Sequence, residues 1–175
     1  PRAYSQSDLR LQCELRGLDG SRGRVCAVIR LLGYDNRGHR QRRGLMETAL
    51  KVVGELGAAE KGEGGDFHAM AYQNHLVLFF FPPDGGDGDA GRDGPPVESV
   101  ARMAGRLDSM GMQTVCGVSL RHAGLETLRP SVDEAFAAIR FGLALDIGRT
   151  VYAYREYRFP HILSTALSPL QARDL

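Results

Sequence analysis

A nearly continuous apolar run at residues 24–32 constrains the fold more than any other feature of the sequence. Between Val25 and Leu32 only Arg30 is polar. A strand with one face in water alternates apolar and polar residues, whereas a strand covered on both faces does not. The run therefore predicts a central strand that is buried on both faces.

The next segments predict a helix and a β-hairpin. Between Arg37 and Leu56 apolar residues recur on one stripe at helical spacing. Two short apolar segments then follow, Phe67–Tyr72 and Leu76–Phe81, with Gln73-Asn74-His75 between them. Short apolar segments separated by a few turn residues are typical of a hairpin.

The second half of the chain continues this alternation. A helix is predicted after Pro95-Pro96, since proline suits the first helical turn, and residues 112–120 predict another strand. Ser131 and Glu134 have the spacing of a capping box, in which the serine is the N-cap and the glutamate lies three residues on. We therefore expect a helix to begin at Ser131, and a last strand over residues 150–154.

The element order predicts an α+β fold of the ferredoxin-like type. Two right-handed β-α-β crossovers around a hairpin give an antiparallel sheet with helices on one face, here followed by an appended α-β unit. We expect an N-terminal helix and turn over residues 1–23, the α/β domain over 24–157, and a partly helical linker over 158–175.

Three stretches of the sequence carry a resemblance to a known family. They are the approach Gly17–Arg22 into the first strand, the hairpin Ala69–Phe80, and Cys116-Gly117-Val118-Ser119 followed by Ser131–Ile139. In their order and spacing they resemble the GGDEF-like middle domain of PucR/CdaR-type bacterial transcriptional regulators. The resemblance covers residues 7–165 and includes the expected strand Val151–Tyr154.

This resemblance implies a regulatory role. In that family the middle domain connects an N-terminal sensory part to a C-terminal helix-turn-helix that binds DNA. We therefore expect a non-catalytic signal-relay domain, not an enzyme. Its expected partners are the neighbouring sensory and helix-turn-helix domains and a second copy in a homodimer, with DNA bound only through a domain absent from this sequence. The alternative is a small-molecule effector domain that uses a degenerate nucleotide cleft.

The string Gly64-Gly65-Asp66-Phe67 resembles the signature turn of diguanylate cyclases, but it stands in the wrong place. In those enzymes the turn joins two strands, and its carboxylate helps to hold a metal near the guanine nucleotide. Here residues 58–63 have no strand pattern, and the predicted hairpin turn at residues 73–75 holds no carboxylate. Arg30-Leu31-Leu32 stands where such enzymes have acidic residues. We therefore predict no GTP turnover, no metal and no cofactor, and assign no catalytic residue.

Two polar clusters allow other interpretations. Asp87, Asp89 and Glu98 partly match a calcium-binding loop, but Arg92 stands where that loop requires glycine, so a solvated loop is expected. A basic cluster precedes and begins the first long helix: Arg37, His39, Arg40, Arg42 and Arg43. It could meet phosphates, nucleic acid or an acidic partner domain, or it could be a solvated face.

Composition excludes several classes of protein. With 22 Lys and Arg against 21 Asp and Glu, the net charge of +1 gives no global field that would attract nucleic acid or an anionic membrane. The longest apolar run, Leu76–Phe81, is too short to span a bilayer. The first residues, from Pro1, contain neither a signal peptide nor an initiator methionine, which suggests an excised fragment. Three cysteines without a C-x-x-C pair indicate free thiols in a reducing cytoplasm: Cys13, Cys26 and Cys116.

Overall fold

The computed structural model describes residues 22–34, 38–59, 66–81, 94–146 and 148–171 of the chain. The helix predicted near the N-terminus lies outside the described residues, as does nearly all of the polar loop predicted at 84–94. The same holds for three groups of residues discussed above: Cys13, Arg37 and Gly64-Gly65.

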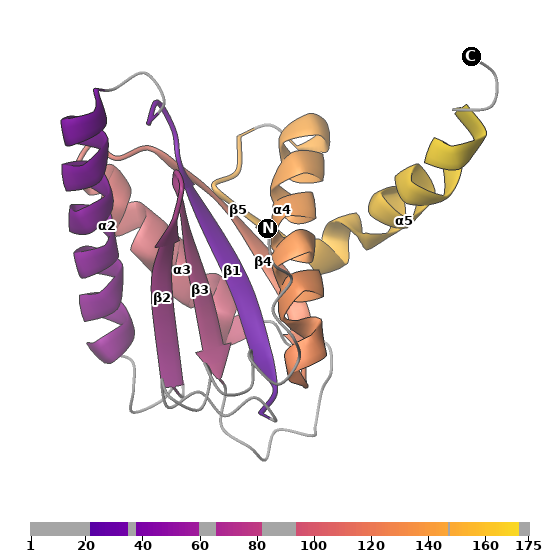
Figure 1. Ribbon diagram of the computed structural model, residues 1–175, viewed down its shortest axis with the longest axis horizontal. Helices are drawn as coiled ribbons and strands as arrows, with labels where there is room; N and C mark the ends of the chain where they lie inside the picture. Colours follow the sequence, from indigo (N-terminus) through magenta and orange to yellow (C-terminus); the bar gives the residue numbers. More distant parts are fainter. Residues whose placement is uncertain (1–21, 35–37, 60–65, 82–93, 147, 172–175) are drawn as a thin grey trace.

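The described residues form a five-stranded sheet in the order β2-β3-β1-β4-β5 (Figure 1). Its strands are β1 Arg24–Leu31, β2 Asp66–Tyr72, β3 His75–Phe81, β4 Thr114–His122 and β5 Val151–Ala153. β1 lies at the centre and pairs antiparallel with both β3 and β4, whereas β5 runs parallel to β4. The apolar run at residues 24–32 is thus the central strand, as predicted.

Helices cover both faces of this sheet (Figure 1). They are α2 His39–Ala59, α3 Gly94–Ser109, α4 Leu128–Leu145 and α5 Tyr154–Gln171, with a short 3-10 turn, η1, at Leu125–Thr127. α2 and α3 pack on one face, as the ferredoxin-like order requires, and the appended α4 covers the other. The predicted α+β fold with an appended α-β unit is confirmed.

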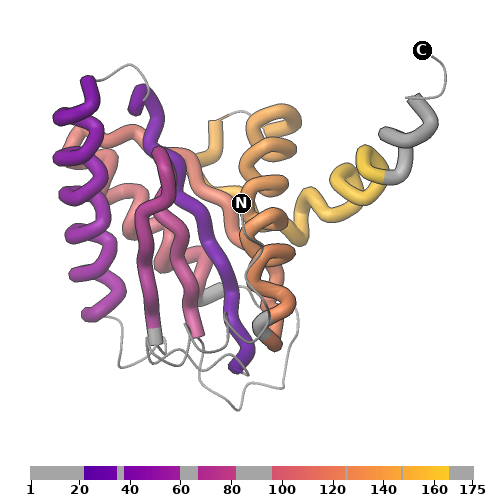
Figure 2. The backbone as a smooth tube through the Cα atoms, viewed as in Figure 1, coloured from indigo at the N-terminus to yellow at the C-terminus, as the bar shows by residue number. Residues whose placement is uncertain are grey.

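α5 begins at the residue that follows β5 and leads away from the sheet (Figures 1 and 2). Its first turn packs with α4 and buries Tyr154 and Tyr157. Farther along the helix, Phe159, Ile162 and Leu163 are exposed. Neither α5 nor any other described helix combines the length and the apolar character needed to cross a membrane.

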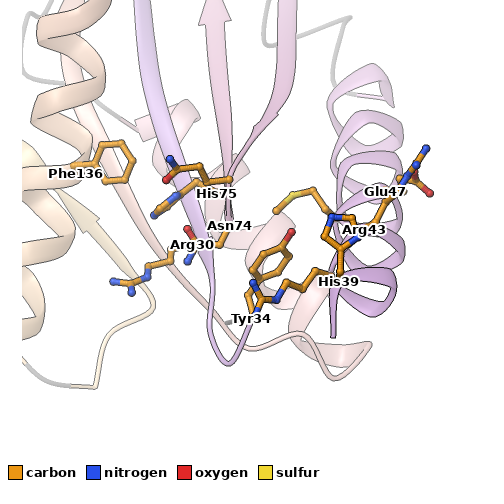
Figure 3. Close-up of a pocket in the computed structure, with 11 residues that line it drawn as sticks. Arg30, Tyr34, His39, Arg43, Glu47, Asn74, His75 and Phe136 are labelled. Atoms are coloured by element: carbon orange, nitrogen blue, oxygen red, sulfur yellow. The ribbon is translucent and has the colours of Figure 1, made fainter. Parts of the chain in front are cut away.

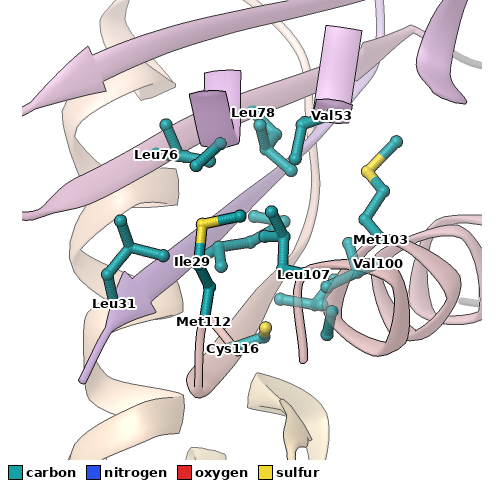
Figure 4. Packing of buried hydrophobic residues seen from close by; sticks show 14 of the residues in the cluster. Ile29, Leu31, Val53, Leu76, Leu78, Val100, Met103, Leu107, Met112 and Cys116 are labelled. Atoms are coloured by element: carbon teal, nitrogen blue, oxygen red, sulfur yellow. The ribbon is translucent and has the colours of Figure 1, made fainter. Parts of the chain in front are cut away.

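β1 is buried on both faces because its side chains alternate between two separate clusters. Every second residue from Val25 to Leu31 packs against α2 and α3, in the cluster that Figure 4 shows. Cys26 and Val28 face the other way and pack beneath α4. Full burial of one such aliphatic side chain stabilises the fold by about 1.5–3 kcal/mol. Arg30 continues the alternation toward the α4 side, where it is exposed.

Gly117 allows α4 to approach β4 backbone to backbone. A Cβ atom added at this position would overlap the carbonyl oxygen of Ala135 and would lie 2.9 Å from Cγ1 of Ile139. Both of these partners belong to α4, and one of them is main chain, which cannot rotate aside. The closeness of helix to strand therefore depends on the absence of a side chain at Gly117.

Ser119 supplies a hydrogen-bond acceptor at an irregularity in the pairing of β1 with β4. The register shifts between Val25 and Ala27, which removes Cys26 from the regular ladder. The buried N–H of Cys26 donates instead to Oγ of Ser119 (2.9 Å), and the Ser119 hydroxyl donates to the carbonyl oxygen of Leu120 (2.7 Å). The Ser119 hydroxyl thus replaces the main-chain acceptor that the Cys26 N–H lacks at this register shift.

α4 begins earlier than the sequence predicts. The capping box at Ser131 and Glu134 does not form, because the helix starts at Leu128 with Thr127 as its N-cap. Ser131 is fully buried in the first turn and donates its hydroxyl to the carbonyl oxygen of Leu128 (2.8 Å). The capping-box prediction is therefore wrong, since the serine hydroxyl is used inside the helix instead of at its end.

Glu134 ties α4 to the end of β4 instead of capping the helix. Its Oε2 accepts a hydrogen bond from the backbone N–H of Leu120 (3.1 Å) and lies 2.8 Å from Nε2 of His122. The side chains of His122 and Glu134 are only 20% and 17% exposed. Water screens this contact less than it screens a pair on the surface.

The substitution Gly117→Ala is expected to destabilise the protein. Its methyl group would overlap the main chain of α4, and overpacking of this kind costs about 1–3 kcal/mol. Urea unfolding followed by circular dichroism measures the loss. Gly105→Ala in α3 is the matched control, because nothing lies within 4 Å of its added Cβ, and alanine in a helix should there add about 0.5–1 kcal/mol. An unchanged stability of G117A would contradict the close contact.

Ser119→Ala should also lower the free energy of unfolding. It leaves the buried N–H of Cys26 without its acceptor, which costs about 1–3 kcal/mol. Ser109→Ala serves as the control, because that hydroxyl is exposed and bonds only to the carbonyl oxygen of Arg106 (2.7 Å), so its loss should change stability by less than about 0.5 kcal/mol. Equal losses in the two variants would refute the special role of Ser119.

Candidate functional site

An open hollow lies where the β2–β3 turn, the end of β1 and the start of α2 meet (Figure 3). It encloses about 900 Å³, and we call it the hairpin-end pocket. Its walls come from segments far apart in the sequence. They are formed by Arg30, Tyr34, His39, Arg42, Arg43, Met46, Glu47, Gln73, Asn74, His75 and Phe136.

The hairpin turn is joined to β1 through its main chain. Gln73 adopts a left-handed φ of 55°, and the carbonyl oxygen of Asn74 accepts a hydrogen bond from the last residue of β1 (3.2 Å). The β1–β3 register pairs Arg30 with His75, so these side chains share one face of the sheet. On that face the His75 ring meets Phe136 edge-on, with 4.8 Å between the ring centroids.

The hairpin-end pocket carries more positive than negative charge. Three arginines are among its lining residues, Arg30, Arg42 and Arg43, against one acidic residue, Glu47. Nε of Arg43 lies 2.8 Å from Oε1 of Glu47, but these side chains are 78% and 65% exposed. An ion pair this exposed to water contributes little and is easily exchanged for another anion. With neutral imidazoles the lining keeps two net positive charges, which suits an anionic ligand.

The structure brings part of the predicted basic cluster into this pocket. His39, Arg42 and Arg43 line it, and the Arg42 guanidinium lies 5.8 Å from the centre of the Tyr34 ring. Arg40 is exposed and does not line the pocket. Arg37 lies outside the described residues. The interpretation as a solvated face therefore fits Arg40, whereas the other three residues share a hollow.

Sequence reasoning misses Arg30 and His75. The sequence analysis treats Arg30 as an interruption of an apolar run and as a replacement for a cyclase carboxylate, and His75 as a residue of the expected turn, but assigns neither to a site. Their approach depends on the register between β1 and β3, which local patterns do not specify. One signal was present, because a charged residue in a strand otherwise buried on both faces needs an opening to solvent or a ligand.

The described part of the Gly-Gly-Asp-Phe string, Asp66 and Phe67, begins the first strand of the hairpin and does not form its turn. β2 begins at Asp66, and the turn between β2 and β3 is Gln73-Asn74. Within the described residues no group of three or more His, Cys, Asp and Glu side chains is placed to hold a metal ion. Of the residues resembling a calcium loop, Glu98 is exposed on α3, and Asp87 and Asp89 lie outside the described residues.

Cys26 and Cys116 are buried free thiols, as predicted for these two positions. Burial raises the pKa of each thiol to about 12. The thiolate is the reactive form of cysteine, so neither residue is an effective nucleophile at neutral pH. Cys13 lies outside the described residues.

The sequence of this chain matches a family model. The model of the GGDEF-like domain matches residues 2–141, well over half of the chain. The chain belongs to the GGDEF-like domain family. This match does not tie the GGDEF-like domain to PucR/CdaR regulators. No curated protein matches it.

Solved structures of cyclases are similar to this GGDEF-like domain to different extents. The active GGEEF domain of a diguanylate cyclase from Vibrio cholerae aligns with a TM-score of 0.52 at 13% identity, over 83% of this chain and 89% of that one. A bacterial light-regulated adenylyl cyclase aligns with a TM-score of 0.41 at 7% identity, over 58% of this chain and 54% of that one. An adenylyl cyclase from P. aeruginosa gives 0.40 at 13% identity, over 56% of this chain and 55% of that one.

The similarity to the Vibrio cholerae domain contradicts the prediction that the chain is not an enzyme. The fold is a cyclase-type enzyme fold, and the Vibrio cholerae domain that shares it is active. The prediction depended on the resemblance to a family of regulators and on single positions, namely the displaced Gly-Gly-Asp-Phe string, the turn at residues 73–75 and Arg30. Such positions describe one corner of the sheet and do not decide the chemistry of a fold.

Stability should fall as the pH rises from about 9 to about 12. Below pH 9 both buried thiols are protonated in the folded and the unfolded state. Above it the unfolded chain loses protons that the folded chain retains, so the free energy of unfolding decreases with pH. Urea unfolding across this range measures the slope, and Cys116→Ala should make it shallower. A slope unchanged in C116A would contradict the thiol contribution.

Proposed function

We propose that this GGDEF-like domain is a regulatory domain that binds a phosphate-bearing small molecule in the hairpin-end pocket. The supporting observation is the meeting of Arg30, Arg42 and Arg43 around one hollow beside the hairpin turn. Guanidinium groups bind phosphate oxygens through paired N–H donors and stay charged at physiological pH. The excess of positive charge favours a ligand with at least two negative charges.

Rings around the hairpin-end pocket favour a ligand that also has a flat unsaturated part. Phe136 and His75 lie on one side of it and Tyr34 on the other (Figure 3). Flat bases pack well against such rings. A nucleotide combines a base with phosphates, and the shared fold of a diguanylate cyclase domain supports this ligand class.

We expect the phosphates to meet the arginines directly. Glu47 is the one carboxylate among the residues that line the hairpin-end pocket, and it is already paired with Arg43. A divalent ion between protein and phosphates usually needs one or two protein carboxylates of its own. Binding in the hairpin-end pocket should therefore persist when divalent ions are removed.

We further propose that the chain is part of a PucR/CdaR-like transcriptional regulator in the cytoplasm. In this regulator, ligand binding in the hairpin-end pocket would change the position of α5. Phe136 lines the pocket and belongs to α4, which packs against α5. Phe141 of α4 contacts the ring of His161 in α5, with 5.7 Å between ring centroids. A shift of α4 on binding thus has a short path to α5. The proposed partners are neighbouring sensory and helix-turn-helix domains and a second copy of the chain.

Calorimetric titration with GTP in the presence of EDTA tests the ligand proposal. We expect binding that weakens about tenfold in Arg43→Gln, because a hydrogen bond to a charged group contributes about 1.5 kcal/mol. Arg106→Gln removes the same charge from the exposed end of α3 and should bind GTP as the unchanged protein does. The proposal fails if GTP does not bind in EDTA, or if both variants lose affinity equally.

A further inference from the structure

A second hollow, of about 720 Å³, lies between α4, α5 and the start of β3. We call it the α4–α5 hollow. It shares Arg30, His75 and Phe136 with the hairpin-end pocket. Its remaining lining residues belong to α4 except for His161, which comes from α5. An occupant of this hollow would therefore touch the sheet and both helices.

The α4–α5 hollow carries less charge than the hairpin-end pocket. Arg30 and Arg140 line it together with one carboxylate, that of Asp133, which leaves one net positive charge when the imidazoles are neutral. Asp133 also lies 3.7 Å from Arg129, one turn earlier on α4. A single net charge suits a ligand with one negative charge and not a polyphosphate.

Arg140 is held in a position from which it can bind such a ligand. Its guanidinium lies over the ring of Phe141, 4.7 Å from the ring centre. Stacking occupies the flat face of a guanidinium but leaves the N–H groups along its edge. That edge matches the two oxygens of a carboxylate. Arg140 is exposed, so a ligand can reach it.

Apolar side chains lie beside these charges on one face of α4. Phe136, Ile139 and Leu143 line the hollow at helical spacing. Leu143 is 40% exposed, although it is a large apolar side chain. A flat apolar body resting on Phe136 and Leu143 would remove this surface from water, which is favourable.

α5 contributes a ring that is already fixed in place. The hydroxyl of Tyr154 lies 2.8 Å from Nδ1 of His161, and the ring of Phe141 also contacts the His161 ring, with 5.7 Å between the ring centroids. A side chain that is ordered before binding loses little freedom when a ligand arrives. His161 therefore offers a firm wall at the α5 end of the hollow.

From these features we infer that the α4–α5 hollow binds a small organic monocarboxylate with a flat apolar body. Arg30 and Arg140 hold the carboxylate, and Phe136 and Leu143 hold the body. This site goes beyond the proposed nucleotide site. The two can be tested separately, because Arg140 and Leu143 do not line the hairpin-end pocket.

Calorimetry of the full chain with 1-naphthoate tests the site, with neutral 1-naphthamide and inorganic phosphate as matched probes. We expect 1-naphthoate to bind with a Kd below about 1 mM, as a ligand of its size can. The other two probes should bind at least about tenfold more weakly, since each lacks either the charge or the apolar body. Equal binding of naphthoate and naphthamide, or tighter binding of phosphate, would overturn the inference.

Single-residue variants show which of the two hollows binds 1-naphthoate and which binds GTP. Arg140→Gln should weaken 1-naphthoate about tenfold, the loss expected for a hydrogen-bonded charge, and should leave GTP affinity unchanged. Arg43→Gln should do the reverse. Arg106→Gln, on the opposite face of the sheet, should change neither, and a thermal melt of each variant confirms that it is folded. The carboxylate site is refuted if R140Q binds 1-naphthoate as well as the unchanged protein, or if R106Q loses as much.

Discussion

The approach of α4 to β4 at Gly117 sets the position of everything on that face of the sheet. Because no side chain separates Gly117 from the main chain at Ala135, the helix lies close enough for Glu134 to reach the backbone of β4. Phe136, which follows Ala135 in α4, is thereby brought against His75 at the start of β3. Both hollows include Phe136, so their shape follows from this one contact between helix and strand.

Elements governed by local pattern were predictable from the sequence, and elements governed by tertiary contact were not. The apolar run of β1 and the hairpin around Gln73-Asn74 appear where periodicity and turn residues place them. The start of α4 does not, because Ser131 and Glu134 match a capping pattern and yet find partners inside the helix and on β4. A pattern of two residues indicates which hydrogen bonds their side chains can make, but the tertiary packing determines which of these hydrogen bonds form.

The candidate site divides in the same way. Its basic residues at the start of α2 stand out in the sequence. They line one hollow with Arg30 only because of the register between β1 and β3 and the packing of α4 on the opposite face of the sheet. The two hollows share Arg30, His75 and Phe136 yet differ in net charge and in apolar surface. Neighbouring regions of one surface can therefore select different anions. The GGDEF-like fold was predicted from the sequence and is confirmed, whereas the prediction that the chain is not an enzyme is contradicted by the similarity of the whole sheet to an active cyclase domain.

α5 follows β5 without a single intervening residue. A flexible linker would let the helix reorient freely, but here no linker residue separates the strand from the helix. At 1.5 Å per residue, the 18 residues of α5 form a rod of about 27 Å. A rotation of about 5° at Tyr154 would displace the far end of this rod by about 2 Å. Motions too small to disturb the pairing of β4 with β5 are thus amplified into a displacement that a contacting surface can detect.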